Sequence, residues 1–343
     1  MTRKYFSEEL PRVVSYNAPI TMIVALRSYG KTFAFTKRGI ENALKGQQFM
    51  WIRRYRTERD KAAPSFFDDI QAHGLFPEYE FKTGGGKGWM RRRGDDNEPW
   101  KVICYFVALS EAQSWKGTAF PDVTMLVFDE FIRELRTPPG YLPDDVGAFL
   151  SLYKTVSRDR SNVRAYLCAN ACDVVNPYFL FAGINGEPPE GFTWYHDKTI
   201  LMYYPKPADF ADEERKTIVG RLVAGTPYES AMINNEFANA HDAFIAKKPP
   251  RARYRYGFIW RGETFGVWLD DSEGLYYVTK KVIKGEQLFT MTASDMRPNL
   301  VMIERAAPYA KGLLRLYRFG VLRYESAAVR ERFTKMLSLI GLR

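Results

Sequence analysis

Apolar segments alternate with amphipathic helical patterns through about the first 200 residues of the chain. Strands are predicted at residues 21–25, 48–53, 101–109, 122–130 and 165–169, and helices at 31–45, 66–70 and 146–153. A parallel sheet requires this alternation, because the crossover between two parallel strands is usually a helix. The pattern therefore predicts an α/β domain with a mainly parallel sheet over residues 1–207.

The pattern changes beyond Pro205. Residues 209–222 and 234–246 are expected to be helical, and the segment Lys247-Lys248-Pro249-Pro250 breaks the chain. Strands at 253–260, 264–269 and 275–278 are joined by turns and predict an antiparallel meander, which helices at 308–319 and 327–340 follow. We expect a small helical linker at residues 208–246 and a smaller α+β domain at 247–343.

Composition narrows the class of protein. The net charge of +10 favours an anionic partner such as nucleic acid, although solubility alone would explain a modest excess. The three cysteines, Cys104, Cys168 and Cys172, have neither disulfide-framework nor zinc-ligand spacing, so a reducing cytoplasm is expected. The sequence has no secretory signal and no run of the roughly 20 apolar residues that cross a bilayer, so no membrane partner is expected.

A phosphate-binding P-loop is predicted at residues 22–32, where a short apolar strand leads through a tight loop into a helix. The loop's backbone N–H groups would cradle phosphates, the Lys31 amine would reach the terminal oxygens, and the Thr32 hydroxyl would hold Mg²⁺. Ala25 stands where the motif G-x-x-x-x-G-K-[ST] has its first glycine, so an ordinary strand-to-helix turn is the alternative. The predicted nucleotide-binding residues are Arg27, Ser28, Tyr29, Gly30, Lys31 and Thr32.

A second phosphate-site motif lies about a hundred residues later, where an apolar run ends in Asp129 and Glu130. A buried parallel strand with this pattern delivers two carboxylates to the sheet's carboxyl edge, as a Walker B motif does. Asp129 would support Mg²⁺ together with Thr32, and Glu130 would activate the attacking water. Asp-Glu pairs after apolar runs are common, so the motif gains its weight from the P-loop that precedes it.

Two further polar residues fit an additional-strand catalytic glutamate (ASCE) P-loop domain. Asn170 ends the strand after the Walker B motif, where a sensor residue would hydrogen-bond the water or the γ-phosphate; a turn former is the alternative. Arginines precede that strand, among them Arg158, which could serve a neighbouring subunit as an arginine finger. For each arginine taken singly, surface solvation is the alternative.

Several basic segments are candidates for nucleic-acid contact, with ordinary solvated loops as the alternative. Arg53, Arg54 and Arg56 follow a predicted strand, and a glycine-rich segment at residues 82–94 predicts an exposed hairpin tip in which Trp89 could stack on bases. The remaining candidates are Lys87, Arg91, Arg92, Arg93, Lys247 and Lys248. Tyr16, before the first predicted strand, is a candidate for stacking on adenine, with packing as the alternative.

Longer runs extend these motifs. The chain carries Arg-Ser-Tyr-Gly-Lys-Thr at 27–32, Ile-Arg-Arg-Tyr at 52–55, Val-Phe-Asp-Glu-Phe-Ile-Arg-Glu at 127–134 and Val-Val-Asn-Pro-Tyr-Phe-Leu-Phe at 174–181. With these runs in this order, nearly the whole chain resembles the DNA-packaging ATPases of the phi-twenty-nine-type small tailed phages. A generic P-loop protein would not carry both of the last two runs.

The resemblance implies an ATP- and Mg²⁺-dependent motor that drives double-stranded viral DNA into a preformed capsid. Each subunit of a homo-oligomeric ring, a pentamer, would act at the capsid's portal vertex in the host cytoplasm, with a packaging RNA as a further partner. By similarity Arg158 corresponds to the arginine finger that acts in trans, and Lys116 falls where the family has a second basic residue proposed to reach a neighbour's nucleotide. The tail domain resembles the family's RNase H-like domain, which lacks a working nuclease.

The sequence is also compatible with two other classes of function. A phage helicase or nuclease would use the tail domain for chemistry, and Asp270, Asp271 and Glu273 are clustered acids there. Contiguous Asp-Asp-Ser-Glu-Gly in a meander suits a turn better, so nuclease activity is not predicted. A structural head component with a degenerate P-loop is the other alternative.

Overall fold

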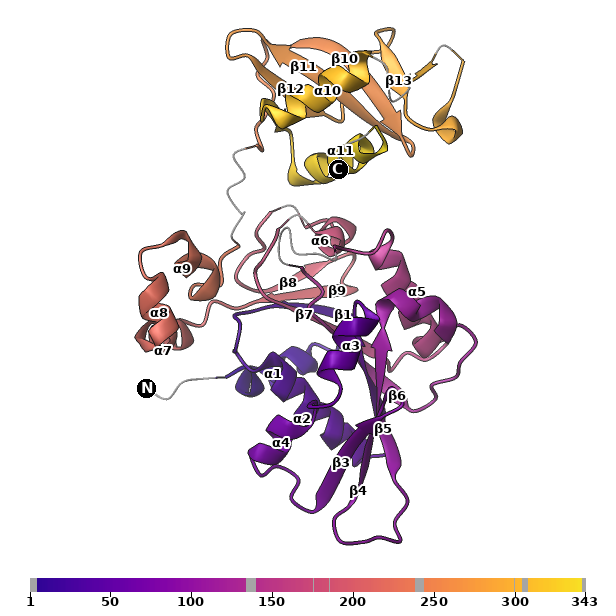
Figure 1. The fold of residues 1–343 in the computed structure, drawn as a ribbon, viewed down its shortest axis with the longest axis vertical. Helices are drawn as coiled ribbons and strands as arrows, with labels where there is room; N and C mark the ends of the chain where they lie inside the picture. The colour runs from indigo at the N-terminus through magenta and orange to yellow at the C-terminus, as the bar shows by residue number, and fades with distance from the viewer. Residues whose placement is uncertain are drawn as a thin grey trace. The chain divides into compact units, whose positions relative to one another are not determined.

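The computed structural model describes residues 5–133, 140–174, 176–184, 186–237, 244–298, 300–303 and 308–340. The chain divides into two compact units, Met1–Ala240 and His241–Arg343, each built around its own sheet (Figure 1). The division falls inside the predicted linker, residues 208–246. That residues 208–246 form a separate linker stays a prediction.

The first unit is built on a nine-stranded sheet with the order β3-β4-β5-β2-β6-β7-β1-β9-β8. Six neighbouring strands run parallel: β5 (Lys101–Ala108), β2 (Gln48–Arg53), β6 (Val123–Asp129), β7 (Arg164–Ala169), β1 (Ile20–Val24) and β9 (Ile200–Tyr204). The edge strands β3 (Tyr79–Gly84), β4 (Lys87–Arg92) and β8 (Gly191–Tyr195) are antiparallel to their neighbours. The strand β7 lies between β1 and β6, so the predicted additional-strand α/β fold is confirmed.

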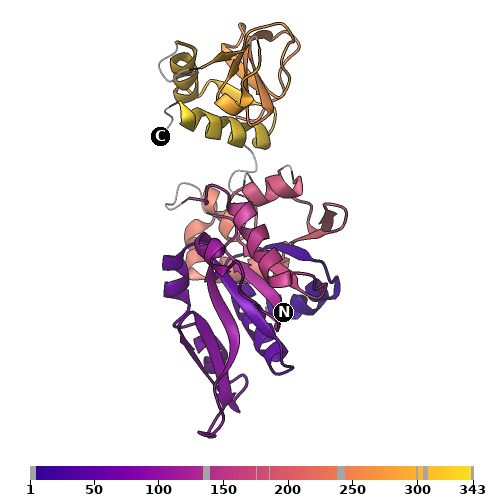
Figure 2. The ribbon, with the colours of Figure 1, turned by 90° about the vertical axis from the view of Figure 1, so that its right-hand side faces the viewer.

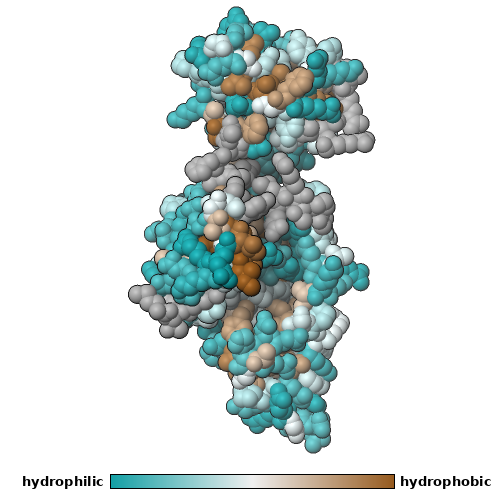
Figure 3. All heavy atoms as spheres, turned by 60° about the vertical axis from the view of Figure 1, so that its left-hand side comes forward, coloured by the Kyte–Doolittle hydropathy of each residue, from teal (hydrophilic) through white to brown (hydrophobic). Residues whose placement is uncertain are grey.

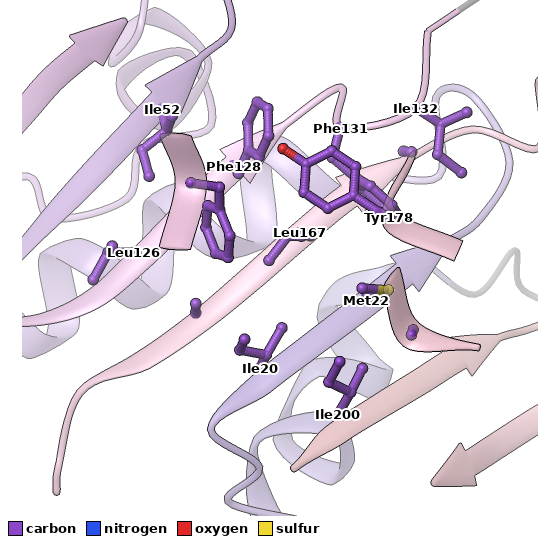
Figure 4. Close-up of a cluster of buried hydrophobic side chains, with 14 of the residues drawn as sticks. Ile20, Met22, Ile52, Leu126, Phe128, Phe131, Ile132, Leu167, Tyr178 and Ile200 are labelled. Atoms are coloured by element: carbon purple, nitrogen blue, oxygen red, sulfur yellow. The ribbon is translucent and has the colours of Figure 1, made fainter. Parts of the chain in front are cut away.

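Both faces of this sheet are covered, which explains the continuous apolar runs of its central strands. Met22 and Val24 of β1 pack into one cluster with side chains of α5 (Asp145–Ser157) and α6 (Pro177–Ala182), and Figure 4 shows part of it. Ile23, between them, points to the other face and packs with α1 (Phe6–Ser15), α2 (Lys31–Ala43), α4 (Asp68–Ala72) and α7 (Ala208–Lys216). The side-chain alternation of a strand thus divides the core into two layers.

The basic run after β2 is a helix, α3 (Arg56–Ala62), which sequence reasoning had placed in a loop. The Glu58 carboxylate accepts a hydrogen bond from the Tyr55 backbone N–H at 3.2 Å and closes the first turn. Arg56 and Asp60 form an i,i+4 ion pair at 3.5 Å. A capping carboxylate and an i,i+4 pair are both local helix signals, so this helix was readable from the sequence.

The glycine-rich segment forms the predicted hairpin, which projects from the edge of the first unit (Figure 2). Gly85 and Gly86 connect β3 to β4, and both have positive φ, at 58° and 72°. A two-residue turn of this kind needs positive φ at both positions, which glycine adopts without strain.

The second unit has a six-stranded sheet with the order β14-β13-β10-β11-β12-β15. The predicted antiparallel meander is confirmed as β10 (Arg253–Trp260), β11 (Glu263–Asp270) and β12 (Leu275–Thr279). Three short strands, β13 (Leu288–Thr290), β14 (Val301–Met302) and β15 (Leu322–Tyr324), add to it in parallel. With α10 (Pro308–Arg318) and α11 (Ala327–Leu339) packed against this sheet, the predicted α+β fold is confirmed.

Three short helices follow the first sheet: α7, α8 (Ile218–Val223) and α9 (Pro227–Met232). The helix predicted at 234–246 is wrong for residues 234–237 and 244–246, which are not helical, and its middle lies outside the described residues. On α8 the apolar side chains of Ile218, Val219 and Leu222 are 71%, 51% and 74% exposed, and a hydrophobic patch is visible on this face of the unit (Figure 3). Among the described helices, none is long and apolar enough to cross a membrane.

Candidate functional site

The loop between β1 and α2 has the backbone of a phosphate-binding turn. Gly30, just before α2, has φ 88°, and Ser28 has φ 60°. Ala25, by contrast, has no positive φ; its side chain is fully buried, and its N–H donates to the Ala169 carbonyl at 3.1 Å. A methyl group is therefore tolerated at the position where the sequence motif has glycine.

Lys31 begins α2 and lies at the centre of this loop. Its Nζ donates hydrogen bonds to the carbonyl oxygens of Ala25 at 2.7 Å and Leu26 at 2.8 Å, and to Asn170 Oδ1 at 3.0 Å. Burial of the side chain lowers the pKa of Lys31 to about 8. The amine is thus held between the P-loop backbone and the end of β7, where sequence reasoning had placed the sensor Asn170.

The other predicted nucleotide-binding side chains divide into two groups. Arg27, Ser28 and Thr32 are exposed at the mouth of the loop, and the Thr32 hydroxyl lies at the first turn of α2. Tyr29 is fully buried, with its ring 5.0 Å from that of Phe210. Only the backbone of Tyr29 is therefore placed to meet a phosphate.

The Walker B carboxylates follow β6, and Arg53 at the end of the neighbouring strand β2 contacts both. Arg53 Nη1 lies 2.7 Å from Asp129 Oδ2, and its Nη2 lies 2.8 Å from Glu130 Oε2. Glu130 turns away from the strand with φ 58°, and its side chain is 55% exposed against 16% for Asp129. Burial raises the pKa of Asp129, and the positive charge of Arg53 opposes that rise.

Arg54 is buried, and the prediction that it contacts nucleic acid is wrong. Its side chain is 1% exposed, and its Nε lies 2.7 Å from Asp145 Oδ2. It also donates to the backbone carbonyls of Glu130 at 3.0 Å and Phe131 at 2.7 Å. Arg53 also differs from expectation, because its guanidinium is engaged by the Walker B carboxylates. Arg53 is the last residue of β2 and Arg54 lies just beyond the strand, and the two neighbouring arginines have different partners.

Parallel strands bring these groups to one edge of the sheet. Lys31 follows β1, Arg53 ends β2, Asp129 and Glu130 end β6, and Asn170 follows β7. These are the carboxyl ends of four neighbouring strands, where α/β sheets bind their ligands. The arrangement brings a cation, two carboxylates and an amide to the same place, and these groups could bind phosphate, Mg²⁺ and water.

Arg158 and Lys116 lie at the opposite end of the same sheet, where its parallel strands begin. Arg158 follows α5 with φ 46°, is exposed, and donates to the Thr118 carbonyl at 3.2 Å. Thr118 belongs to the loop that carries the exposed Lys116 and leads into the start of β6. Because β6 is seven residues long, this end is about 20 Å from the Walker B end. These two cations therefore lie far from the P-loop of their own chain.

The other basic candidates lie on helix α3, the hairpin and the second unit. The Arg56 side chain is 70% exposed, while Arg91 is 19% exposed and pairs with Glu80 at 2.5 Å. Lys248 Nζ lies 4.6 Å above the Trp268 ring. Contact with nucleic acid stays a prediction for Arg56, Lys87, Arg91, Arg92, Arg93, Lys247 and Lys248.

Tyr16 favours the packing interpretation. Its ring stacks on Phe192 at a centroid distance of 4.5 Å. It precedes β1, whereas the P-loop follows β1, so the two lie at opposite ends of that strand. The described structure therefore gives Tyr16 no place beside the nucleotide loop.

Sequence reasoning assigned Arg53 to nucleic-acid contact and missed two further residues at this site. Arg53 binds the Walker B pair, and its place at the end of a predicted strand was the available signal. Asp145 and Tyr178 surround Arg54, with the Tyr178 hydroxyl donating to Asp145 Oδ1 at 2.6 Å. No local pattern marks these two residues, because the Arg54–Asp145 contact joins positions 91 apart in the chain.

Comparison with known proteins shows the family to which this chain belongs. The sequence model of the family described as "Podovirus DNA encapsidation protein (Gp16)" matches residues 3–338. The DNA packaging protein of Bacillus phage B103 is 34% identical over 332 residues, covering 94% of this chain and 99% of the relative. That of Bacillus phage phi29 is 32% identical over 333 residues, covering 95% and 96%.

Solved structures agree as well. A chain of the bacteriophage Phi-29 viral genome packaging motor assembly superposes with a TM-score of 0.75 at 30% identity, covering 98% of this chain and 99% of that one. The N-terminal domain of the DNA packaging ATPase from bacteriophage phi29 matches with a TM-score of 0.51 at 34% identity, covering 58% and 96%. The protein therefore belongs to the family of podovirus DNA encapsidation proteins.

Proposed function

We propose that this protein, a DNA-packaging ATPase by family, hydrolyses ATP at interfaces between subunits of a homo-oligomeric ring. The observation that carries the proposal is the separation of the catalytic groups. Lys31, Glu130 and Asn170 lie at one edge of the sheet, and Arg158 and Lys116 lie at the other, about 20 Å away. An arginine at the far edge serves a phosphate site only if it belongs to another subunit.

Within one subunit the P-loop would hold the phosphates of ATP. Backbone N–H groups at the start of α2 and the Lys31 ammonium supply positive charge to the β- and γ-phosphates. The exposed Thr32 hydroxyl and the Asp129 carboxylate are oxygen donors at the same edge, and such donors fit Mg²⁺, which keeps most of its waters. Bound there, Mg²⁺ would neutralise charge on the phosphate oxygens.

Glu130 would be the group that activates water. Its side chain is the exposed member of the carboxylate pair, and Arg53 holds it 2.8 Å from a guanidinium nitrogen. A carboxylate in this position accepts a proton from water as the oxygen attacks the γ-phosphorus. Asn170 would orient the same water or a γ-phosphate oxygen, and Arg158 of a neighbouring subunit would stabilise the charge that develops in the transition state.

The energy of hydrolysis would drive double-stranded DNA through the ring into the capsid. A packaging motor needs a sequence-independent grip, and contacts to phosphates supply one without reading bases. The net charge of +10 and the exposed Arg56, Arg92 and Arg93 support this role. The partners proposed are DNA, the capsid's portal, a packaging RNA and further copies of this chain, in a pentamer that assembles at the portal vertex in the host cytoplasm.

The exposed apolar side chains of α8 support association with other chains. Ile218 and Leu222 are more than 70% exposed on a six-residue helix. Exposed apolar clusters on a protein surface commonly mark sites of protein–protein contact. In a ring, each subunit contacts two neighbouring subunits.

The contacts of the acidic residues in the second unit support a turn rather than a nuclease site. Asp270 pairs with Arg251 at 2.9 Å and accepts hydrogen bonds from Ser272. Asp271 pairs with Arg253. These carboxylates are engaged by arginines and by their own turn, and a two-metal centre would need them to converge on one point.

Complementation between two inactive variants tests the shared site. Glu130→Gln should bind ATP as the natural protein does but lose turnover, because an amide cannot accept the proton. Arg158→Ala should keep its own Glu130 but only a residual turnover, because an arginine finger is worth about 10³- to 10⁵-fold in kcat. Mixed rings contain interfaces with Glu130 from one variant and Arg158 from the other, so mixing should restore ATPase activity. Mixed rings as inactive as the separate variants would refute the arrangement in trans.

A further inference from the structure

A buried ionic cluster joins the catalytic end of β6 to the beginning of α5. The Arg54 guanidinium contacts the Asp145 carboxylate at 2.7 Å and the Phe131 carbonyl at 2.7 Å, and both charged side chains are 1% exposed. A third hydrogen bond, of 3.0 Å, goes to the backbone carbonyl of Glu130, the residue proposed to activate water. One side chain therefore ties the peptide groups on both sides of Phe131 to α5.

The surroundings leave this cluster little freedom. The Tyr178 hydroxyl donates to Asp145 Oδ1 at 2.6 Å, and the Leu142 N–H donates to Asp145 Oδ2 at 2.9 Å. The Arg54 guanidinium also lies 5.2 Å from the centre of the Phe128 ring. Figure 4 shows Phe128, Phe131 and Tyr178 gathered in the core at this point. A buried ion pair is tolerated only with its hydrogen bonds in place, so a displaced partner moves the others.

The helix α5 connects this cluster to Arg158. Asp145 is its first residue, and its thirteen residues span about 20 Å. Phe149, Leu152 and Val156 along its length are buried in the core of the first unit. Arg158 follows immediately, with φ 46°. Rigid secondary elements with packed side chains can carry coupling between sites, so a shift at Asp145 would reach Arg158.

We propose that Arg54, Asp145 and Tyr178 form a positioning cluster that sets Glu130 for the subunit's own ATP site and, through α5, Arg158 for the neighbour's site. The inference rests on the arrangement in trans proposed above. None of the three residues touches ATP in this mechanism. A change in this cluster would move one subunit's catalytic carboxylate and its arginine finger together. The cluster thereby links successive ATP sites around a ring.

Tyr178→Phe is the mildest test, because it removes one hydroxyl and keeps the ring. The matched control is Tyr204→Phe, whose hydroxyl also lies in the core of the first unit and donates to a carboxylate, Glu187, at 2.8 Å. Thermal unfolding would show how much stability each variant loses. In assembled rings kcat should fall by about 2- to 30-fold for Tyr178→Phe, the range of coupling effects at a distance. KM should stay unchanged, and the control should keep the natural kcat.

A second variant addresses the arginine directly. Arg54→Lys keeps the charge, but an ammonium lacks the planar fork that reaches a carboxylate and two carbonyls together. It should lower kcat at least as far as Tyr178→Phe does. A natural kcat in either variant, or an equal fall in the Tyr204→Phe control, would overturn the role of the cluster in catalysis.

Combining Tyr178→Phe with Arg158→Ala tests the connection through α5. If the cluster acts partly through Arg158, the fold-loss from Tyr178→Phe should be smaller when Arg158 is already absent. Equal fold-losses in both backgrounds would show that the cluster acts on Glu130 alone and would overturn the connection. An unchanged kcat in Arg158→Ala alone would instead refute the proposed finger, an outcome separate from a failure of the cluster.

Discussion

The lowered pKa of Lys31 predicts that ATP affinity depends on pH in a range that is easy to measure. Burial lowers that pKa to about 8, from an ordinary value near 10.5. Without nucleotide, Lys31 should therefore lose its proton as the pH rises through about 8. Phosphates favour the ammonium, so ATP binding raises the pKa of Lys31, and above pH 8 binding takes up a proton. The affinity should then weaken as the pH rises.

The magnitude follows from the fraction of Lys31 that carries a proton. With a pKa of about 8 that fraction is about 0.86 at pH 7.2 and about 0.09 at pH 9, a ratio of roughly tenfold in affinity. In free energy this is about 1.3 kcal/mol, since one pH unit corresponds to 1.36 kcal/mol. Calorimetric titration of the protein with Mg²⁺ and a non-hydrolysable ATP analogue would measure both the Kd and the protons taken up.

The control is Lys31→Arg, because a guanidinium stays protonated throughout this range. Its Kd should be flat between pH 7.2 and 9, whatever its absolute value. A natural protein whose Kd is equally flat, with no proton uptake at pH 8.5, would refute the assignment of Lys31 as a buried phosphate ligand with a lowered pKa.

Two further predictions concern stability. Arg53→Ala leaves the two Walker B carboxylates side by side without their cation, so the free energy of unfolding should fall by about 3 kcal/mol at pH 7.5. This loss of stability should shrink at lower pH, where protonation of Asp129 removes its repulsion from Glu130. An equal loss at pH 7.5 and pH 5.5 in urea unfolding would contradict this. Gly39→Ala places a Cβ 2.6 Å from the Phe49 ring, so overpacking should cost about 1–3 kcal/mol and lower the Tm. Gly84→Ala, with nothing within 4 Å of its Cβ, is the control and should leave the Tm unchanged.

Much of the site was predictable from the sequence because its groups lie next to regular elements. A strand followed by Lys31-Thr32 and a buried strand followed by Asp129-Glu130 are local patterns, as is the strand that precedes Asn170. Once these strands are parallel, their carboxyl ends must share one edge. The convergence of these residues therefore follows from local pattern and a general rule of sheet topology.

What only the tertiary structure decided is the partner of each arginine. Arg53 and Arg54 are adjacent and chemically identical, yet one faces the Walker B carboxylates and the other lies buried against Asp145. The sequence carried no sign of this difference, because the partners are 76 and 91 residues away. Likewise, only the fold places Arg158 at the edge opposite Lys31. A charged residue in a sequence indicates which kinds of partner it can bind. Burial and distance depend on residues far apart in the chain, and they decide which partner is bound.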